Sequence, residues 1–231
     1  MAKVVAFNGS PRKDGNTSIL IGHMFEELEN EGIETELVQV GKKKIRPCTA
    51  CMKCFENKDG HCVFDDDIVN GCIDKMVEAD GIILGSPVYF LDVTPEMKAL
   101  IDRAGFVSMA NGGLYRRRAG MAVAAVRRAG ASRTIDTMLH FLLVGGMVVP
   151  GFPVIGVGRE IGDVNKDEEG IGRARDAGKN MVVDEEDARF KSTYRDTEYY
   201  FCCEYCKKQF DANPKRYSRI VPDMHIDSVS C

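Results

Sequence analysis

Five short predicted strands, most of them apolar runs, alternate with amphipathic stretches and constrain the fold of this chain more than any other feature. The strands cover residues 4–7, 34–40, 81–86, 121–126 and 152–157. Apolar side chains recur at helical spacing in residues 17–31, 68–77, 97–104, 135–143 and 167–182. Continuous apolar runs indicate strands that are buried on both faces, as in parallel sheets covered by helices. The sequence therefore predicts an α/β fold with a doubly wound, five-stranded parallel sheet.

The composition bounds the size and the compartment of the protein. The chain has 231 residues, 44% of them hydrophobic, which suffices for one core or for one domain with a small appendage. Its net charge of −4 is not that of a general nucleic-acid binder, and no apolar run reaches the roughly 18 residues that span a bilayer. The first residues lead straight into a strand without a signal peptide, so we expect a cytoplasmic protein. Nine cysteines in a reducing compartment favour metal or redox chemistry over disulfides.

A polar, glycine-rich loop joins the first strand to the first helix. It reads Gly-Ser-Pro-Arg-Lys-Asp-Gly-Asn-Thr over residues 9–17. The start of a helix attracts anions through its dipole and its free backbone N–H groups, so phosphate is the favoured ligand. An ordinary polar loop with a capping Asn or Thr is the alternative. The chain has no G-x-x-x-x-G-K-[ST] motif, so we do not expect a nucleotide-hydrolysing loop. The candidate phosphate-binding residues are Ser10, Arg12, Asn16, Thr17 and Ser18.

Two further loops follow the third and the fourth strand. Parallel sheets bind ligands at the carboxyl ends of their strands, so these loops should lie close to the first one. The second loop offers flat aromatic faces for a planar ring beside a proline that restricts the backbone. The third loop combines arginines, whose charge would favour a reduced flavin, with a glycine that permits close approach. Helix packing, subunit contacts or solvated surface would explain each loop alone. The candidate residues are Pro87, Val88, Tyr89, Phe90, Arg127, Arg128 and Gly130.

The first two of these loops resemble the NADPH-dependent FMN reductase family. The matching motifs are Gly-Ser-Pro-Arg-x-x-Gly-Asn-Thr in residues 9–17 and Gly-Ser-Pro-Val-Tyr-Phe in residues 85–90. The resemblance covers residues 1–183 and implies a flavodoxin-like fold that binds FMN. It implies that the FMN phosphate lies at the first loop and the ring at the other two, with NAD(P)H as the reductant. It also implies a homodimer or homotetramer with the flavin near the subunit interface.

Four cysteines follow the second strand with the spacing Cys48-x2-Cys51-x2-Cys54-x7-Cys62. Four thiolates in a short loop can hold a [4Fe–4S] cluster, which takes one sulfur per iron, and zinc could use the same set. The compact spacing resembles that of iron–sulfur flavoproteins, a branch of the same family. Free or redox-active thiols near a flavin are the remaining alternative. Cys72 falls on the apolar face of the second helix, where we expect a core thiol.

The composition changes after residue 184, where aromatic and cysteine residues gather. Residues 194–217 resemble a YHS domain, a small module found in metal-handling proteins. Cys202 and Cys206 lie at x3 spacing with Cys203 beside them, and they could bind a soft metal such as Cu(I) or zinc. A small aromatic-cored appendage with buried thiols is the alternative. We therefore expect a flavodoxin-like FMN-binding domain over residues 1–183 and a YHS-like module with a C-terminal tail over residues 184–231.

These features together predict an FMN-dependent oxidoreductase. FMN would accept electrons from NAD(P)H and pass them to a small-molecule or redox-protein acceptor. No catalytic side chain is expected, because the flavin carries the chemistry while the protein positions it and sets its electrostatics. Two alternatives remain: an electron carrier of the iron–sulfur flavoprotein kind, and a metal-binding or redox-sensing protein on a flavodoxin-like scaffold. We expect no nucleic-acid or membrane partner.

Overall fold

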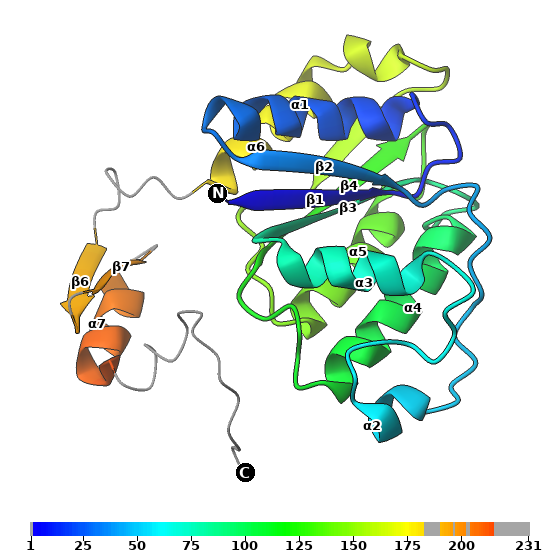
Figure 1. The fold of residues 1–231 in the computed structure, drawn as a ribbon. Helices are drawn as coiled ribbons and strands as arrows, with labels where there is room; N and C mark the ends of the chain where they lie inside the picture. Colours follow the sequence, from blue (N-terminus) through cyan, green and yellow to red (C-terminus); the bar gives the residue numbers. More distant parts are fainter. Residues whose placement is uncertain (1, 183–189, 196, 202–203, 215–231) are drawn as a thin grey trace. The chain divides into compact units, whose positions relative to one another are not determined.

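The structure of the protein, a computed structural model, describes residues 2–182, 190–195, 197–201 and 204–214 (Figure 1). The chain divides into two compact units, Met1–Val182 and Val183–Cys231. The division falls one residue before the boundary expected from the sequence. Within the described residues, no helix is both long enough and apolar enough to cross a membrane.

The first unit contains the predicted parallel sheet. Its strands are β1 (Lys3–Asn8), β2 (Glu34–Gln39), β3 (Gly81–Pro87), β4 (Ala119–Val126) and β5 (Val154–Val157). Every neighbouring pair is parallel, and the order across the sheet is β2-β1-β3-β4-β5. This is the flavodoxin-like order, in which the direction of winding reverses between β1 and β3. The fold predicted from the alternating pattern is therefore confirmed.

Helices cover both faces of the sheet (Figure 1). They are α1 (Asn16–Asn30), α3 (Val69–Glu78), α4 (Pro95–Ala110), α5 (Ala131–Val144) and α6 (Glu168–Asn180), with a short 3-10 helix η1 (Asp163–Lys166). Alternate residues of β1 enter different cores: Val5 and Phe7 pack with α3, α4 and α5, whereas Val4 and Ala6 pack with α1 and α6. Burial on both faces explains why the strands read as continuous apolar runs.

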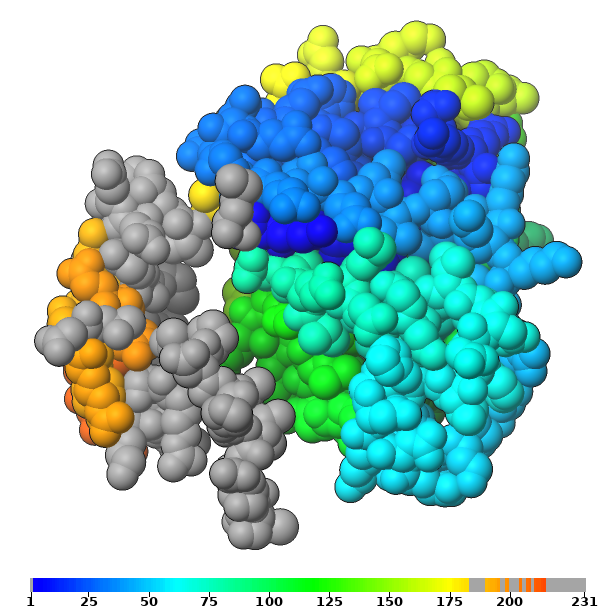
Figure 2. All heavy atoms as spheres, viewed as in Figure 1, coloured from blue at the N-terminus to red at the C-terminus, as the bar shows by residue number. Residues whose placement is uncertain are grey.

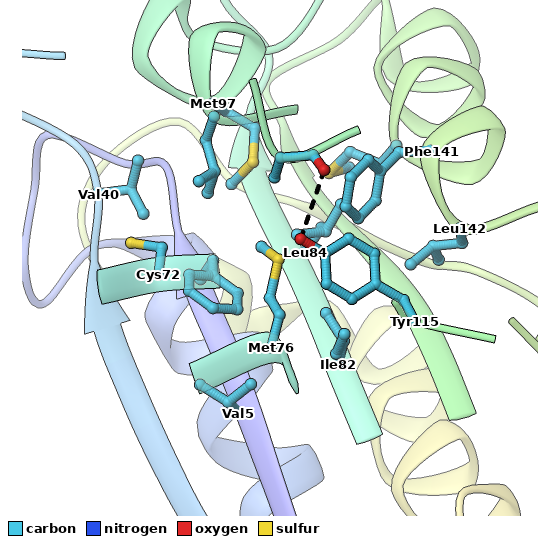
Figure 3. Close-up of a cluster of buried hydrophobic side chains, with 14 of the residues drawn as sticks. Val5, Val40, Cys72, Met76, Ile82, Leu84, Met97, Tyr115, Phe141 and Leu142 are labelled. Carbon is cyan, nitrogen blue, oxygen red and sulfur yellow. Dashed lines mark hydrogen bonds between the residues drawn. The ribbon is translucent and has the colours of Figure 1, made fainter. Parts of the chain in front are cut away.

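The larger core lies between the sheet and helices α3, α4 and α5 (Figure 3). Cys72 of α3 is 1% exposed there, and burial raises the pKa of its thiol to about 12. Tyr115 is fully buried in the same core, where its hydroxyl donates a hydrogen bond to the carbonyl oxygen of Ala104 (3.4 Å) and its ring lies 5.7 Å from that of Phe141. Cys72 is thus a core thiol, as its position on the helix predicted.

The cysteine-rich segment between β2 and α3 contains a short helix, α2 (Lys53–Asn57), that the sequence pattern did not predict. The backbone of the cysteine-rich segment adopts left-handed conformations at Ala50 (φ 51°), Met52 (φ 58°) and Lys58 (φ 52°). Such conformations are uncommon outside glycine. The segment lies on the surface of the first unit (light blue to cyan in Figure 2) and packs on α4 through α2.

The described part of the second unit is a β-hairpin followed by a helix. Strands β6 (Phe190–Tyr194) and β7 (Thr197–Phe201) pair antiparallel, and α7 (Glu204–Ala212) follows them. Phe210 of α7 is 3% exposed, and its ring lies 4.5 Å from Tyr199 and 6.4 Å from Tyr194. Of the two expected metal ligands, Cys202 lies outside the described residues. Cys206 belongs to α7, but its side chain lies outside the described part.

Candidate functional site

The loops after β1 and β3 meet where the winding of the sheet reverses. The N–H of Gly9 donates to the carbonyl oxygen of Gly85 (2.7 Å), which joins the first loop to the carboxyl-terminal part of β3. Thr94, the N-cap of α4, donates its hydroxyl to the Gly9 carbonyl oxygen (2.9 Å), and its N–H donates to Ser86 Oγ (3.0 Å). Open α/β sheets bind ligands at this point. The structure therefore brings the predicted loops to the edge where a ligand is expected.

The start of α1 leaves an anion-binding position open. Gly15 is its N-cap, no described side chain caps the helix, and no acidic residue lies in the first turn. Thr17 is 1% exposed, and its Oγ1 is the one buried side-chain polar atom without a hydrogen bond among the described residues. Free N–H groups at a helix start favour an anion, and a buried unpaired hydroxyl calls for a partner. Phosphate oxygens would satisfy both.

Two of the predicted phosphate ligands already have protein partners. The amide of Asn16 donates to the carbonyl oxygen of Glu160 (2.9 Å) and accepts from the N–H of Gly162 (2.9 Å). Ser18 donates its hydroxyl to the Gly15 carbonyl oxygen (2.8 Å). Asn16 therefore ties the loop after β5 to the start of α1. These contacts give both side chains a role in shaping the loop.

Ser10 is held by a network that the sequence did not reveal. Its N–H donates to Asn8 Oδ1 (3.0 Å), its carbonyl oxygen accepts from Gln39 Nε2 (2.5 Å), and its hydroxyl accepts from the N–H of Arg12 (3.1 Å). Gly41 packs against the same peptide group, because a Cβ on Gly41 would lie 2.1 Å from the Ser10 carbonyl oxygen. The chain after β2 thus braces the first loop. A glycine directly after the strand expected over residues 34–40 was the available signal for this contact.

The second loop ends in a tight turn with an exposed apolar tip. Tyr89 and Asp92 exchange two backbone hydrogen bonds (2.8 and 3.1 Å). Between them, Phe90 (φ 44°) and Leu91 (φ 71°) are left-handed, and Phe90 is completely exposed. Bulky residues rarely adopt this conformation, and strained positions of this kind cluster at ligand sites. The geometry makes this tip a candidate for contact with a ligand or a second subunit.

The third loop packs on the second. A Cβ on Gly130 (φ 93°) would lie 2.7 Å from Val88 Cγ1 and 2.8 Å from Leu91 Cα, so only glycine fits this approach. The sequence suggested that Gly130 would approach a ligand, and the structure places the second loop against it. Arg127 and Arg128 are exposed and line a shared hollow with Val88 and Leu91.

Asp92 anchors the second loop to α5 and was missed by the sequence analysis. Its carboxylate accepts hydrogen bonds from the Thr137 hydroxyl (2.7 Å) and from Arg133 Nε (3.3 Å). Burial alone would raise the pKa of Asp92, but the hydrogen bonds from Thr137 and from the N–H of Val93, with the charge of Arg133, hold the pKa below its ordinary value. The carboxylate therefore stays charged and fixes the turn.

The four predicted cluster ligands share one cavity. Cys48, Cys51, Cys54 and Cys62 all line it, together with apolar side chains and Arg103. Burial raises the pKa of the Cys54 thiol, and the neighbouring Cys62 and Cys51 add to this shift. Among the described residues, no group of three or more His, Cys, Asp or Glu side chains is arranged to hold a single metal ion. The shared cavity with its four sulfur donors matches the donor set of a [4Fe–4S] cluster.

One face of α4 carries this cysteine segment. Arg103 and Phe106, which lie three residues apart on α4, and Asn111, the C-cap of the helix, all contact the segment. The rings of Phe55 and Phe106 meet edge to face at 6.4 Å, and the N–H of Gly60 donates to Asn111 Oδ1 (3.1 Å). The x7 gap before Cys62 thus contains two of the residues that dock the segment on α4, Phe55 and Gly60.

Asp67 forms a buried ion pair with Arg103 beneath the segment, and their side chains are 4% and 0% exposed. Burial alone would raise the pKa of Asp67, but hydrogen bonds from the N–H of Arg46, from Arg103 and from the N–H of Val69 hold it below its ordinary value. The carboxylate is therefore charged and links the start of α3 to α4.

A flavodoxin-like sheet with an anion-binding loop at its β1/β3 edge defines a class of flavin-binding proteins. Within it, the chain belongs to the NADPH-dependent FMN reductase family, whose model matches residues 2–160. A second family model, the YHS domain, matches residues 179–219. The resemblances stated from the sequence are confirmed, and the protein is an FMN-dependent oxidoreductase.

Individual relatives agree with this assignment. An iron–sulfur flavoprotein of Methanocaldococcus jannaschii is 39% identical over 189 residues, which are 78% of this chain and 95% of that protein. An iron–sulfur flavoprotein of Methanosarcina thermophila is 34% identical over 150 residues, which are 64% of this chain and 77% of that protein. Among solved structures, an NAD(P)H:quinone oxidoreductase from Methanothermobacter marburgensis has a TM-score of 0.60 at 17% identity, covering 79% of this chain and 96% of that one. This last similarity shows the fold alone.

Proposed function

We propose that this oxidoreductase binds FMN at the carboxyl-terminal ends of β1 and β3. The FMN takes electrons from NAD(P)H and passes them to a small-molecule or redox-protein acceptor. The buried, unpartnered Thr17 hydroxyl beside the uncapped start of α1 carries this placement. An FMN phosphate there would accept hydrogen bonds from Thr17 and from the first-turn N–H groups. Arg12, which is exposed on the same loop, would add positive charge. Ser10, Asn16 and Ser18 would hold the loop in shape.

The flavin ring would lie at the second and third loops. The hollow there combines apolar surface from Val88 and Phe90 with the positive charge of Arg127 and Arg128. Positive charge near the ring favours the anionic reduced form of a flavin, and an apolar cover excludes water. We propose a ring-binding set of Pro87, Val88, Tyr89, Phe90, Arg127, Arg128 and Gly130.

Replacing Thr17 with the nearly isosteric valine should weaken FMN binding and stabilise the FMN-free protein. Without ligand the hydroxyl has no described partner, and an unsatisfied buried group costs about 1–3 kcal/mol. With FMN bound, the hydroxyl would gain a hydrogen bond to a charged group, worth about 1.5–3 kcal/mol. The Kd for FMN should therefore rise at least about 10-fold. Fluorescence titration with FMN and urea unfolding of the FMN-free protein measure the two effects.

Ser108→Ala is the matched control for this experiment. Ser108 is 2% exposed, like Thr17, but its hydroxyl accepts a hydrogen bond from the N–H of Leu114 (3.0 Å). Its removal should lower the free energy of unfolding and leave the affinity for FMN unchanged. If the Thr17→Val variant binds FMN with wild-type affinity, then the phosphate does not lie at the start of α1.

We further propose that Cys48, Cys51, Cys54 and Cys62 hold a [4Fe–4S] cluster. Their shared cavity supports this assignment, because such a cluster takes one sulfur per iron. The names of the two relatives, both iron–sulfur flavoproteins, point the same way. The cluster would supply one-electron transfer beside the flavin. The thiols would bind it, and the apolar wall from Phe106 and Val107 would limit its contact with water.

NADPH or NADH should be oxidised steadily by the purified protein with FMN and a quinone acceptor under anaerobic conditions. Hydride transfer to the flavin needs no protein acid or base, so FMN alone should complete the site. The rate is followed by loss of nicotinamide absorbance, with the protein freed of FMN as the control. The second candidate function is an electron carrier, which the four-cysteine cavity favours. If the bound flavin stays oxidised in the presence of NADH or NADPH but is reduced by dithionite, the result would favour the electron carrier.

A homodimer or homotetramer is the assembly that we propose. Met109 of α4 and Leu143 and Val144 of α5 expose 56%, 59% and 68% of their surface on helices that contact each other. A hollow between these helices includes Met109 and Val144 in its lining. Exposed apolar surface of this kind marks contact sites between proteins.

We propose that residues 1–183 form a flavin domain and that residues 184–231 form a separate YHS-like module with a C-terminal tail. The YHS match and the division of the chain after Val182 support this arrangement. The soft-metal site at Cys202 and Cys206 stays a prediction. None of the described cysteines, Cys48, Cys51, Cys54, Cys62 and Cys72, forms a disulfide in the described part. They favour a reducing compartment, and we propose the cytoplasm.

A further inference from the structure

A buried arginine lines the cysteine cavity. Arg103 is 1% exposed, and its guanidinium donates to the carbonyl oxygens of Phe64 (2.6 Å) and Arg46 (3.2 Å) and to the carboxylate of Asp67. Its Nε donates to Cys62 Sγ at 3.3 Å. Three of these four partners are oxygens that fix the segment. The fourth is the sulfur of a proposed cluster ligand.

The bond to sulfur is the contact that the packing of the segment does not require. A neutral thiol is a weak hydrogen-bond acceptor, whereas a charged acceptor strengthens a hydrogen bond from a guanidinium roughly twofold. A metal-bound cysteine sulfur carries negative charge. The Nε–H of Arg103 is thus aimed at an atom whose acceptor strength depends on the bound cluster.

We propose that Arg103 is a positioning residue that acts through Cys62 and raises the reduction potential of the cluster. This inference rests on the [4Fe–4S] cluster proposed above. On one-electron reduction, the cluster charge falls by one unit and more negative charge reaches the cysteine sulfurs. A hydrogen bond and a positive charge at Cys62 Sγ therefore stabilise the reduced form more than the oxidised form. Asp67 offsets part of the charge of Arg103, so the hydrogen bond to Cys62 Sγ is the contribution that the test isolates.

The backbone of Cys62 does not depend on Arg103. Its N–H donates to Asn70 Oδ1 (2.9 Å), and its carbonyl oxygen accepts from Asn70 Nδ2 (2.9 Å). Asn70 belongs to α3, whereas Arg103 belongs to α4. Replacing Arg103 should therefore leave Cys62 in place and the cluster bound, so that a change in potential can be measured.

The test is an anaerobic redox titration with dithionite, the electron source, on reconstituted full-length protein. Arg103→Lys keeps a positive charge for Asp67 but has no Nε–H for the sulfur. The double variant Arg103→Met with Asp67→Asn removes the pair without leaving an unpaired buried charge. Both should keep about four irons per chain. In both, the equilibrium constant for reduction should fall at least about tenfold, a shift of about 59 mV to lower potential for a one-electron couple.

Arg46→Gln is the matched control. The Arg46 guanidinium also lies over Phe64, 4.5 Å from the ring centroid, but it pairs with Asp66 (2.7 Å) and is half exposed. Its loss should leave the potential unchanged. An iron-loaded Arg103 variant with the wild-type potential would overturn the inference, as would a folded, FMN-binding Arg103 variant that cannot be loaded, since a residue that only sets the potential leaves the cluster in place. Wild-type protein that takes up no iron would instead refute the cluster, and this inference with it.

Discussion

FMN binding is expected to be lost when Gly41 is replaced by alanine, although Gly41 lies outside all three proposed flavin loops. The added Cβ would lie 2.1 Å from the carbonyl oxygen of Ser10 and 2.7 Å from the nitrogen of Pro11. Overpacking among side chains costs about 1–3 kcal/mol, and here the backbone itself must move. The first loop would shift away from the start of α1. We expect the Kd for FMN to rise at least about 100-fold, measured by fluorescence titration.

Gly22→Ala is the control for Gly41→Ala. Gly22 lies inside α1, and a Cβ there would meet nothing within 4 Å. Alanine is the better helix former by about 1 kcal/mol, so this variant should be slightly more stable and bind FMN as the wild type does. If Gly41→Ala binds FMN with wild-type affinity while folded by circular dichroism, then the position of Ser10 does not matter for the phosphate.

The fold could be predicted from the sequence because its signals are local. Most strands are continuous apolar runs, with the edge strand β2 (Glu-Thr-Glu-Leu-Val-Gln) as the exception, and each main helix has a single apolar stripe. The order of elements therefore follows from windows of a few residues. The edge that binds a ligand also follows, since a parallel sheet brings successive strand ends together. The short helix α2 was missed because it has five residues and none of them is buried. Nothing in its pattern distinguishes it from a loop.

The parts of the site that escaped prediction depend on contacts between distant segments. Arg103 lies 41 residues from Cys62 and 57 from Arg46, and a charged residue on a helix normally predicts exposure. Asp92 likewise meets its partner Thr137 across 45 residues. The candidate ligands themselves were visible because their residue types carry the chemistry. Their supports were not, because the role of each is set by its neighbours in space.

Helix α4 connects the two halves of the proposed electron path. Its N-cap Thr94 donates to Gly9 at the flavin edge, and the same helix carries Arg103 and Phe106 against the cysteine cavity. α4 lies in the core between these ends, where Met97 and Leu100 are fully buried. A rigid helix that shapes both sites would keep the flavin and the cluster in a fixed relation. Because the helix itself shapes both sites, a cysteine variant that loses its iron should still bind the flavin.

Replacing Cys51 with alanine should remove the cluster and leave FMN bound. Cys51 is exposed, so the loss of its side chain should not disturb folding, yet it would supply one of four cluster sulfurs. Iron should fall from about four per chain to less than about one after anaerobic reconstitution. The broad absorbance beyond the flavin bands should disappear while those bands remain. Iron and sulfide assays with a visible spectrum measure both effects on one sample.

Cys72→Ala provides the opposite pattern and so completes this test. Cys72 is 1% exposed in the core and lies outside the cysteine cavity. Its replacement leaves a small void and should cost about 0.5–3 kcal/mol of stability while all four irons stay. Equal iron in Cys51→Ala and the wild type would show that Cys51 is not a ligand. Zinc instead of iron, bound by the same four sulfurs, would keep the cavity as a metal site but remove its role in electron transfer, because zinc has no redox chemistry.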